Sequence, residues 1–404
     1  MRQKKLMLLG GIRYLLPVIE AAHEQGYYVI TADYLPDNIA HRYSDEYVNV
    51  SIIDKEAVLK VAREKEIDGI LSFGVDPGVV SASYVQTQMG IPSFGPFESV
   101  EILQNKDKFR TFLSENGFNV PWAFGFSSLE DALADTDKFS YPLIVKPTDS
   151  AGSKGVTRVD KEEDLKEALE YAFKHSIKGN IIVEEFIEKQ GCSSDSDSFS
   201  VNGVLQFVSF SAQRFDENAA GTFVPAAYSW PSTMNMQQES ELRSELPDLQ
   251  RLLTLLHMKT AVYNIETRVG VNGKTYIMEV SPRGGGNRLS EMVRYSTGVD
   301  MITAGVRAAV GDSVDGIEQK PYMGHWAEII LHSDKDGLFE SLYISKSMRS
   351  YVIEEDLWVM KGDAVHFFEG ANNAIGTLIM KFNSQEQLKE ALEKQGEWLH
   401  ISVD

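Results

Sequence analysis

Two apolar, β-branched runs separated by a tight-turn signal constrain this chain more than any other feature. The first run, at 262–269, reads VYNIETRV, and the second begins at Tyr276 in YIMEVSPRGGGNR. The Asn-Gly pair at 272–273 favours a tight hairpin turn, so the runs are predicted to pair as antiparallel strands. Glu266 and Glu279 then face each other on one side of the ribbon. Two facing carboxylates repel each other unless a cation lies between them, and oxygen ligands that leave room for phosphate suit Mg²⁺.

A surface hairpin whose two glutamates face water is the plain alternative, and upstream segments bear on the choice. An apolar strand is expected at 141–147, carrying Lys146, and a Gly/Ser-rich turn follows it before a short strand at 156–159. Small residues let backbone N–H groups approach phosphate oxygens, and lysines supply point charges. The turn is not a Walker A loop, because the GxxxxGK[ST] order is absent and no helix follows. It is either a lid over a triphosphate or only a turn.

A third segment, at 180–187, has the pattern of a buried strand that ends in two acids and an aromatic residue. Such a strand can offer backbone groups to an adenine edge while an acid accepts a hydrogen bond from the exocyclic amine. A lysine strand, a Gly-rich hairpin, an acid-ended strand and a Glu/Glu ribbon closing in Arg283 follow one another in this order. This order resembles the ATP-grasp superfamily of ligases over about residues 100–310. Within it, the chain looks like the branch that contains biotin carboxylase, carbamoyl-phosphate synthetase halves, phosphoribosylglycinamide synthetase and the L-amino-acid ligases.

The resemblance implies a set of site residues. Nucleotide contacts would come from Lys106, Lys146, Gly152, Ser153, Gly155, Glu184, Glu185 and Ile187, with Lys108 as the competitor of Lys106 and with Glu184 on the adenine amine. Glu266 and Glu279 would hold the metal. Arg283 and Lys146 would be catalytic, and substrate contacts would come from Arg268, Arg283, Gly285, Asn287 and Arg288. The implied cofactors are ATP and Mg²⁺, with Mn²⁺ as an alternative metal.

Three departures from the family pattern qualify these roles. Ser281 stands where the family often has a metal-contacting asparagine, so one metal is expected to be held more weakly. The acid that often follows the adenine strand is displaced into SSDSDS at 193–198, which is expected to be a short polar loop. The biotin carboxylase signature beyond the arginine is absent, so bicarbonate with biotin is not the expected substrate.

The implied reaction is ATP-dependent ligation. The carboxylate of a small molecule attacks the γ-phosphate of ATP, ADP leaves, and an amine or related nucleophile displaces phosphate from the acylphosphate. A carbamoyl-phosphate-synthetase-like or phosphoribosylglycinamide-synthetase-like enzyme is the alternative within the same fold. A nucleotide-binding protein that has lost turnover is the alternative from another class, and only Ser281 points toward it.

Alternating strand and helix patterns at the N-terminus predict an α/β fold with a doubly wound parallel sheet. Gly10-Gly11 with Asp33 invites a dinucleotide-binding interpretation, but the GxGxxG pattern is missing. Residues 215–236 are expected to be loop-like, either lining a substrate pocket through Arg214, Tyr228 or Trp230 or only connecting two strands. The predicted domains are 1–96, N-terminal; 97–310, ATP-grasp with a lid at about 124–187; and 311–404, C-terminal.

Composition and charge narrow the classes of partner. The chain has 404 residues with 43% apolar content, enough to fill two or three cores. Its formal charge of −20 argues against a nucleic-acid partner. No apolar run approaches the roughly 20 residues of a membrane-spanning helix, and the single cysteine excludes an intrachain disulfide. We therefore expect a cytoplasmic enzyme with small-molecule carboxylate and amine substrates, no membrane partner and, from the family resemblance, a homodimer.

Overall fold

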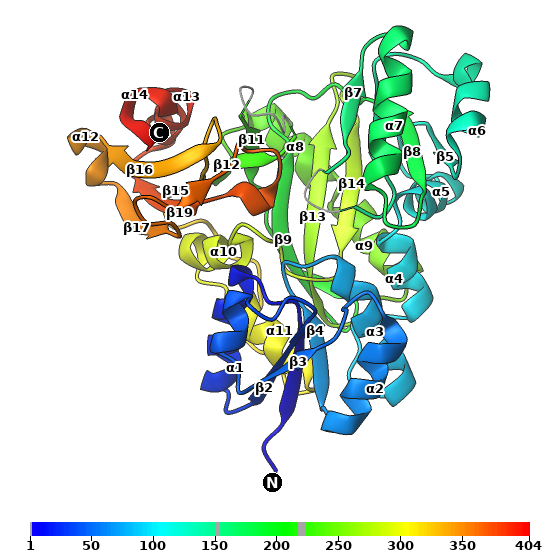
Figure 1. Cartoon of the computed structure of the whole chain (residues 1–404), viewed down its shortest axis with the longest axis vertical. Helices are drawn as coiled ribbons and strands as arrows, with labels where there is room; N and C mark the ends of the chain where they lie inside the picture. The colour runs from blue at the N-terminus through cyan, green and yellow to red at the C-terminus, as the bar shows by residue number, and fades with distance from the viewer. Residues whose placement is uncertain (1, 151–153, 217–222) are drawn as a thin grey trace.

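The computed structural model describes residues 2–150, 154–216 and 223–404 (Figure 1). Its N-terminal region confirms the predicted parallel sheet, in the order β3-β2-β1-β4. These strands are β1 Lys5–Leu9, β2 Tyr28–Asp33, β3 Glu46–Asn49 and β4 Gly69–Ser72. Helix α1 (Leu16–Glu24) lies on one side of the strands, and α2 (Lys55–Lys65) and α3 (Pro77–Met89) lie on the other (Figure 1). The carboxyl ends of parallel strands are where such sheets bind ligands.

A four-stranded antiparallel sheet forms the region predicted as the lid. Its order is β5-β8-β6-β7, with β5 Ala123–Phe126, β6 Leu143–Pro147, β7 Thr157–Val159 and β8 Ile181–Glu185. Helices α4 (Phe97–Leu103) and α5 (Lys106–Glu115) precede this sheet, and α6 (Leu129–Ala134) and α7 (Leu165–His175) accompany it. The apolar side chains of α7 pack onto the strands and form a core separate from the other cores. This sheet therefore has its own apolar core, as a lid subdomain would need.

A second antiparallel sheet, in the order β10-β9-β13-β14, carries the predicted hairpin. Its strands are β9 Ser194–Val201, β10 Val204–Val208, β13 Ala261–Val269 and β14 Thr275–Ser281. Helices α8 (Met236–Ser244) and α9 (Leu246–Leu255) precede the hairpin, and α10 (Leu289–Thr297) and α11 (Met301–Ala309) follow it. The expected polar loop at 193–198 is wrong, because those residues belong almost entirely to β9. Serine and aspartate alternate there with the period of a strand, and both faces are polar.

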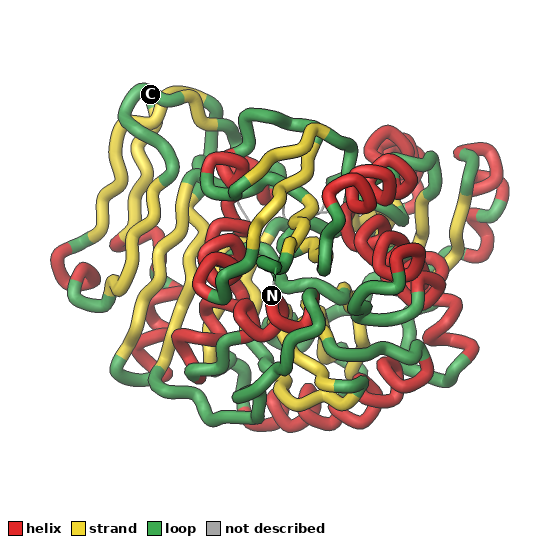
Figure 2. Tube along the Cα trace, turned by 90° about the horizontal axis from the view of Figure 1, so that it is seen from below, coloured by secondary structure: helices red, strands yellow, loops and turns green. Residues whose placement is uncertain are grey.

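The third antiparallel sheet, in the order β11-β12-β15-β19-β17, corrects another expectation. Its strands are β11 Ala212–Phe215, β12 Pro225–Trp230, β15 His325–Leu331, β17 Val352–Leu357 and β19 Gly376–Phe382. Residues 225–230 are thus a central strand and not part of a loop. Pro225 is tolerated because it occupies the first position of the strand. In Figure 2 these long strands run side by side at the left of the molecule.

Shorter elements complete the chain. A small sheet in the order β18-β16-β20 consists of β16 Gly337–Ile344, β18 Ala364–Val365 and β20 Leu399–Val403. The last helices are α12 Lys346–Arg349, α13 Gln385–Glu393 and α14 Gln395–Trp398. The 3-10 helices are η1 Arg13–Leu15, η2 Ile39–Arg42, η3 Thr136–Lys138, η4 Glu162–Asp164 and η5 Ala371–Asn373.

The apolar cores cross the predicted domain boundaries. One core joins Met7 of β1 to Leu252 of α9 and Ile265 of β13, and a second joins Leu6 of β1 to Val306 of α11. Two strands of the C-terminal sheet, β11 and β12, come from inside the predicted central domain. The boundaries near residues 96 and 310 therefore stay predictions. In the ranges that the structure describes, no helix combines the length and apolar character needed to span a membrane.

Candidate active site

The hairpin brings Glu266 and Glu279 opposite each other, as the sequence predicted. Strands β13 and β14 pair antiparallel, and these two glutamates share one register position. On the other edge of β13, the partner of Glu266 is Asp195 of β9. Directly opposed residues share a face of a sheet, so the three carboxylates form a row across three strands. We call Asp195, Glu266 and Glu279 the acidic row.

Burial and mutual repulsion make the acidic row unfavourable without a cation. Burial raises the pKa of Asp195 to about 7, and the charge of Glu266 adds to this shift. Burial also raises the pKa of Glu266, with Arg268 opposing the shift and Glu279 adding to it. Among the described residues, no three His, Cys, Asp or Glu side chains form a group that could hold a metal ion. A Mg²⁺ ion held by the two glutamates would therefore need phosphate or water oxygens as well, which is how this metal is commonly bound.

Lys106, and not Lys108, lies beside the acidic row. The Nζ atom of Lys106 is 3.8 Å from Glu279 Oε2 and donates a hydrogen bond of 3.4 Å to the Ser150 carbonyl. Lys108 instead reaches Glu101 at 3.8 Å, and its side chain is 53% exposed. Helix α5 explains the difference, because residues two positions apart on a helix point in different directions. The geometry favours Lys106 as the lysine that meets a phosphate.

A buried ionic network joins lid strands β6 and β8 to helix α5. Glu184 is 2% exposed and accepts hydrogen bonds from Lys146 Nζ and from Arg110 Nε, the latter at 2.9 Å. Arg110 also donates to the Met278 carbonyl at 2.9 Å, which ties the network to β14. Burial alone would raise the pKa of Glu184, but the two cations outweigh burial and lower it to about 2. Burial lowers the pKa of Lys146, so the pair holds its charges by mutual contact.

This network gives Glu184 partners that the sequence did not predict. Each of its carboxylate oxygens accepts a hydrogen bond from a cationic side chain, so the carboxylate holds Lys146 and Arg110 in place, and its contact with an adenine amine stays a prediction. The N–H of Glu185 donates to the Trp122 carbonyl at 2.9 Å, and the Ile187 carbonyl accepts from Arg268 at 3.3 Å. Those two backbone groups are therefore also in use, and the remaining groups at the end of β8 stay the candidates for an adenine edge.

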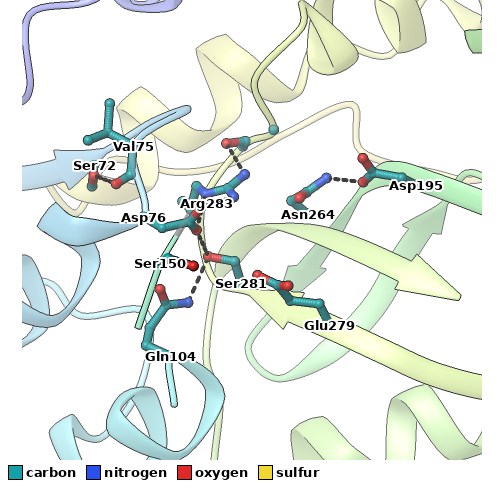
Figure 3. A network of polar contacts seen from close by, with 12 residues as sticks. Ser72, Val75, Asp76, Gln104, Ser150, Asp195, Asn264, Glu279, Ser281 and Arg283 are labelled. Atoms are coloured by element: carbon teal, nitrogen blue, oxygen red, sulfur yellow. Dashed lines mark hydrogen bonds and ion pairs between the residues drawn. The ribbon is translucent and has the colours of Figure 1, made fainter. Parts of the chain in front are cut away.

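Arg283 is fixed by a residue of the N-terminal region that the sequence reasoning missed. Its Nε and Nη2 atoms donate to the two oxygens of Asp76 at 2.7 and 2.6 Å (Figure 3). The charge of Arg283 outweighs burial and lowers the pKa of Asp76, while Asp76 raises the pKa of Arg283 despite burial. Asp76 lies between β4 and α3, at the carboxyl end of the parallel sheet. An acid directly before Pro77 at a strand end was the available signal.

Ser281 is not placed as a weak metal ligand. Its side chain is fully buried, donates to Asp76 at 3.0 Å and accepts from Gln104 at 2.8 Å (Figure 3). Both interactions lie on the side of β14 that meets the N-terminal region. Ser281 therefore supports the pair of Arg283 and Asp76, and the expectation that one metal is held more weakly stays a prediction.

A second buried acid on β9 holds the glycine-rich turn. Asp197 is fully buried and accepts hydrogen bonds from the Gly285 N–H at 2.9 and 3.0 Å and from the Ser290 hydroxyl. Burial raises its pKa to about 6, although these hydrogen bonds oppose the shift. Asn264 donates to both Asp195 and Asp197, at 2.6 and 3.3 Å. The Gly285 N–H donates to Asp197 and is therefore not available to a substrate, contrary to the substrate contact predicted for Gly285.

The other predicted substrate residues also have partners. Asn287 accepts from the Tyr14 hydroxyl at 2.9 Å and donates to Tyr228 at 3.4 Å. Arg268 donates to Ser193 at 3.2 Å and lies 3.6 Å from Glu266, on the side of the row nearer β8. The guanidinium group of Arg288 is held by two carboxylates, Glu291 at 2.8 Å and Glu354 at 2.7 Å. This corrects the substrate role of Arg288, which acts here as a link between α10 and the C-terminal sheet.

Part of the predicted phosphate loop lies outside the described residues, namely Gly152 and Ser153. Gly155 is described and has a positive φ of 76°. A Cβ atom at this position would lie 2.8 Å from both His175 and Pro147. The conformation and the close packing both require glycine there, whether or not the turn also covers a phosphate.

Comparisons with known proteins support the resemblance to ATP-grasp ligases. Residues 139–291 match the family model described as the ATP-grasp domain. A similar curated protein is the carbamoyl phosphate synthase large chain of Ralstonia nicotianae, 22% identical over 78% of this chain and 30% of the relative. The chain thus spans about a third of the length of that relative.

Solved structures resemble the whole chain. The L-amino acid ligase from Bacillus licheniformis is 22% identical, covers 100% of both chains and has a TM-score of 0.83. The phosphoribosylglycinamide synthetase from Anaerococcus prevotii is 20% identical, covers 100% of both chains and has a TM-score of 0.76. Together with the match of residues 139–291 to the ATP-grasp domain, these likenesses show that the chain has the ATP-grasp fold over its whole length.

Proposed function

We propose that this chain is an ATP-dependent ligase that activates a small-molecule carboxylate as an acylphosphate, releases ADP and passes the acyl group to an amine or related nucleophile. The observation that carries the proposal is the acidic row with Lys106 beside it, inside an ATP-grasp domain. Facing carboxylates suit Mg²⁺, and a lysine beside them suits the phosphate that the metal bridges. The alternative of a surface hairpin whose glutamates face water does not explain why Glu266 lies opposite a buried acid, Asp195.

Each part of the site has a task in this proposal. Glu266 and Glu279 would hold Mg²⁺ or Mn²⁺, which would supply positive charge against the ATP phosphates. Lys106 and Lys146 bind phosphate oxygens. Arg283, oriented by Asp76, faces the charge that develops as the phosphoryl group moves to the carboxylate. Acylphosphates react with water, so the lid sheet has to close over the site before transfer.

Lys146 is proposed to act from within its network with Glu184. The side chain of Lys146 is 12% exposed, so its ammonium group can donate to a phosphate while it stays paired with Glu184. A lysine fixed in this way needs little reorganisation when the triphosphate arrives. Arg110 then serves as a positioning residue, because it balances the charge of Glu184 and is itself buried.

The test is ADP release in the presence of Mg·ATP and pooled acids. Amino acids, other small carboxylic acids and bicarbonate form three separate arms, and each is run with and without an added pool of amines. Wild-type protein is compared with Glu279→Gln and with Glu101→Gln, a matched change at a half-exposed glutamate outside the row. We expect one organic acid arm to stimulate ADP release in wild type and Glu101→Gln but not in Glu279→Gln.

Other outcomes would redirect the proposal. Stimulation by bicarbonate alone would favour the carbamoyl-phosphate-synthetase-like alternative, which the relative from Ralstonia represents. Tight ATP binding with no ADP release in any arm would favour a nucleotide-binding protein without turnover.

We also propose that the protein is a homodimer in the cytoplasm, because ATP is supplied in the cytoplasm and one solved neighbour is described as a biotin carboxylase domain dimer. Light scattering would measure the mass in solution.

A further inference from the structure

Three oxygen atoms without a hydrogen-bond donor belong to two buried side chains, Gln213 and Glu328, on one face of the sheet that contains β11, β12 and β15. Gln213 of β11 is opposite Tyr228 of β12, and Tyr228 is opposite Glu328 of β15. The three side chains are 4%, 1% and 0% exposed. Neither oxygen of Glu328 has a hydrogen-bond partner, and Gln213 Oε1 also lacks one. Among the described residues, Glu328 is the one carboxylate with both oxygens in this state.

Gln213, Tyr228 and Glu328 lie next to the proposed active site. The Tyr228 hydroxyl and Gln213 Nε2 both donate to Asp195 Oδ2, at 3.1 and 3.3 Å. Asp195 is a member of the acidic row. The hydrogen bond from Gln213 Nε2 also fixes which end of that amide is the unpartnered oxygen. Gln213 and Glu328 therefore flank a tyrosine, Tyr228, whose hydroxyl is hydrogen-bonded to Asp195 of the acidic row.

Among the residues that the structure describes, no cation donates a hydrogen bond to Glu328. Arg288 is the neighbouring cation that acts on its pKa, but Glu291 and Glu354 already hold that guanidinium group. Burial raises the pKa of Glu328 well above its usual range; the charge of Arg288 opposes this shift, and the carboxylates of Glu291, Asp195 and Glu354 add to it. A buried carboxylate without a donor costs free energy, and this one is surrounded by more negative charge than positive charge. The missing partner should be a cationic hydrogen-bond donor.

We propose that Glu328, with Gln213 Oε1, receives the ammonium group of an amino-acid substrate of the ligase. An ammonium group has three N–H donors, and Gln213 and Glu328 together offer three unpartnered oxygens. Neighbouring strands lie about 4.8 Å apart, so the backbones of Gln213 and Glu328 are roughly 10 Å apart and their side chains can close on a small group over Tyr228. This inference rests on the proposed function, which it narrows from carboxylates in general to those that carry a primary amine.

The test separates amino acids from the same carbon skeletons without the amine. A pool of L-α-amino acids and a matched pool of their deamino carboxylic acids are compared for ADP release by wild type, Glu328→Gln and Glu245→Gln. Glu245 is the control because it is also a buried glutamate, 5% exposed, but lies at the start of α9. We expect wild type and Glu245→Gln to prefer the amino pool. Glu328→Gln should lower kcat/KM for that pool by about 10- to 100-fold and leave the deamino pool unchanged, as for loss of a charged hydrogen bond.

A second readout does not depend on turnover. The amino pool should raise the unfolding temperature of wild type and Glu245→Gln, and this shift should be absent in Glu328→Gln. If no pool releases ADP but the shift pattern holds, the proposed ligase reaction fails and the ammonium site stands. Equal use or equal binding of the two pools by wild type, or an unchanged preference in Glu328→Gln, would overturn the ammonium site. A purely structural Glu328, satisfied by water, would change the unfolding temperature of the variant without changing its preference.

Discussion

Arg283 and Asp76 form a two-point ion pair that joins the end of the β13–β14 hairpin to the carboxyl end of the parallel sheet. The Arg283 side chain is only 8% exposed, and the two residues are 207 positions apart in the chain. The arginine that the sequence marks as catalytic is therefore oriented by another part of the molecule. Changes in the N-terminal region should reach the reaction through this contact.

Replacing Asp76 should impair both stability and turnover. Asp76→Asn leaves Arg283 without its counter-charge, which for a buried, hydrogen-bonded pair costs about 2–5 kcal/mol of unfolding free energy. Turnover should fall further than stability explains, because Arg283 loses its fixed orientation. Urea unfolding and ADP release measure the two effects. The control is Asp248→Asn, which breaks a pair with Arg251 whose side chains are 37% and 40% exposed, and it should cost under about 1 kcal/mol. Equal effects of the two changes would contradict the account.

The network of Glu184, Lys146 and Arg110 predicts a specific pH dependence of stability. The pKa of Glu184 is lowered from its ordinary value of 4.5 to about 2. A carboxyl group with a lowered folded-state pKa stabilises the protein above its unfolded pKa, and this contribution is lost as pH falls through the folded pKa. The free energy of unfolding of wild type should therefore exceed that of Glu184→Gln at pH 7. The difference should shrink between pH 4.5 and pH 2, and a difference that stays constant over this window would refute the prediction.

Repulsion within the acidic row predicts that Mg·ATP stabilises wild type more than a variant that lacks one carboxylate. Burial raises the pKa of Glu266, with Glu279 contributing, so the ionised residue destabilises the protein without a metal. Glu266→Gln should therefore unfold at a higher temperature than wild type in chelator. Adding Mg·ATP should stabilise wild type, because a ligand that binds only the folded state raises its stability, and should stabilise the variant much less. Differential scanning fluorimetry checks both, and a variant that is less stable in chelator would contradict the repulsion.

The glycine-rich turn after Arg283 is predicted to tolerate no side chain at Gly284. A Cβ atom there would lie 2.1 Å from the ring of Phe73, which is 3% exposed. Gly284→Ala forces that core to move and should cost about 1–3 kcal/mol. Gly396→Ala is the control, because a Cβ there meets nothing within 4 Å. Denaturant unfolding of both variants gives the comparison, and similar stabilities would show that the turn can shift.

Local patterns explain which features could be predicted from the sequence. The Asn-Gly pair predicts the hairpin from residues close together in the chain. A β-bulge between Glu266 and Thr267 then shifts the register by one residue and brings Glu279 opposite Glu266. The parallel sheet follows from alternating strand and helix patterns in the same way. The ATP-grasp resemblance supplied Lys106, which the structure places 3.8 Å from Glu279.

The features that were missed depend on distant contacts or on unusual strand composition. Asp76 meets Arg283 and Arg110 meets Glu184 across long stretches of sequence, and no local pattern marks either acid–base pair. The first half of β9 alternates serine with aspartate and has no apolar face, so its sequence predicts a polar loop and not the strand that carries Asp195. Whether a side chain is free also depends on its neighbours. The substrate role of Arg288 failed for that reason, because two glutamates hold its guanidinium group.

The central claim is that the acidic row binds the metal–nucleotide complex. Isothermal titration of a non-hydrolysable ATP analogue into wild type, Glu279→Gln and Glu101→Gln, each with Mg²⁺ and with EDTA, tests it most directly. We predict that Mg²⁺ tightens binding at least tenfold in wild type and Glu101→Gln, equivalent to about 1.4 kcal/mol, and has little effect in Glu279→Gln. Equal Mg²⁺ dependence in all three proteins would contradict the assignment of this row as the metal site.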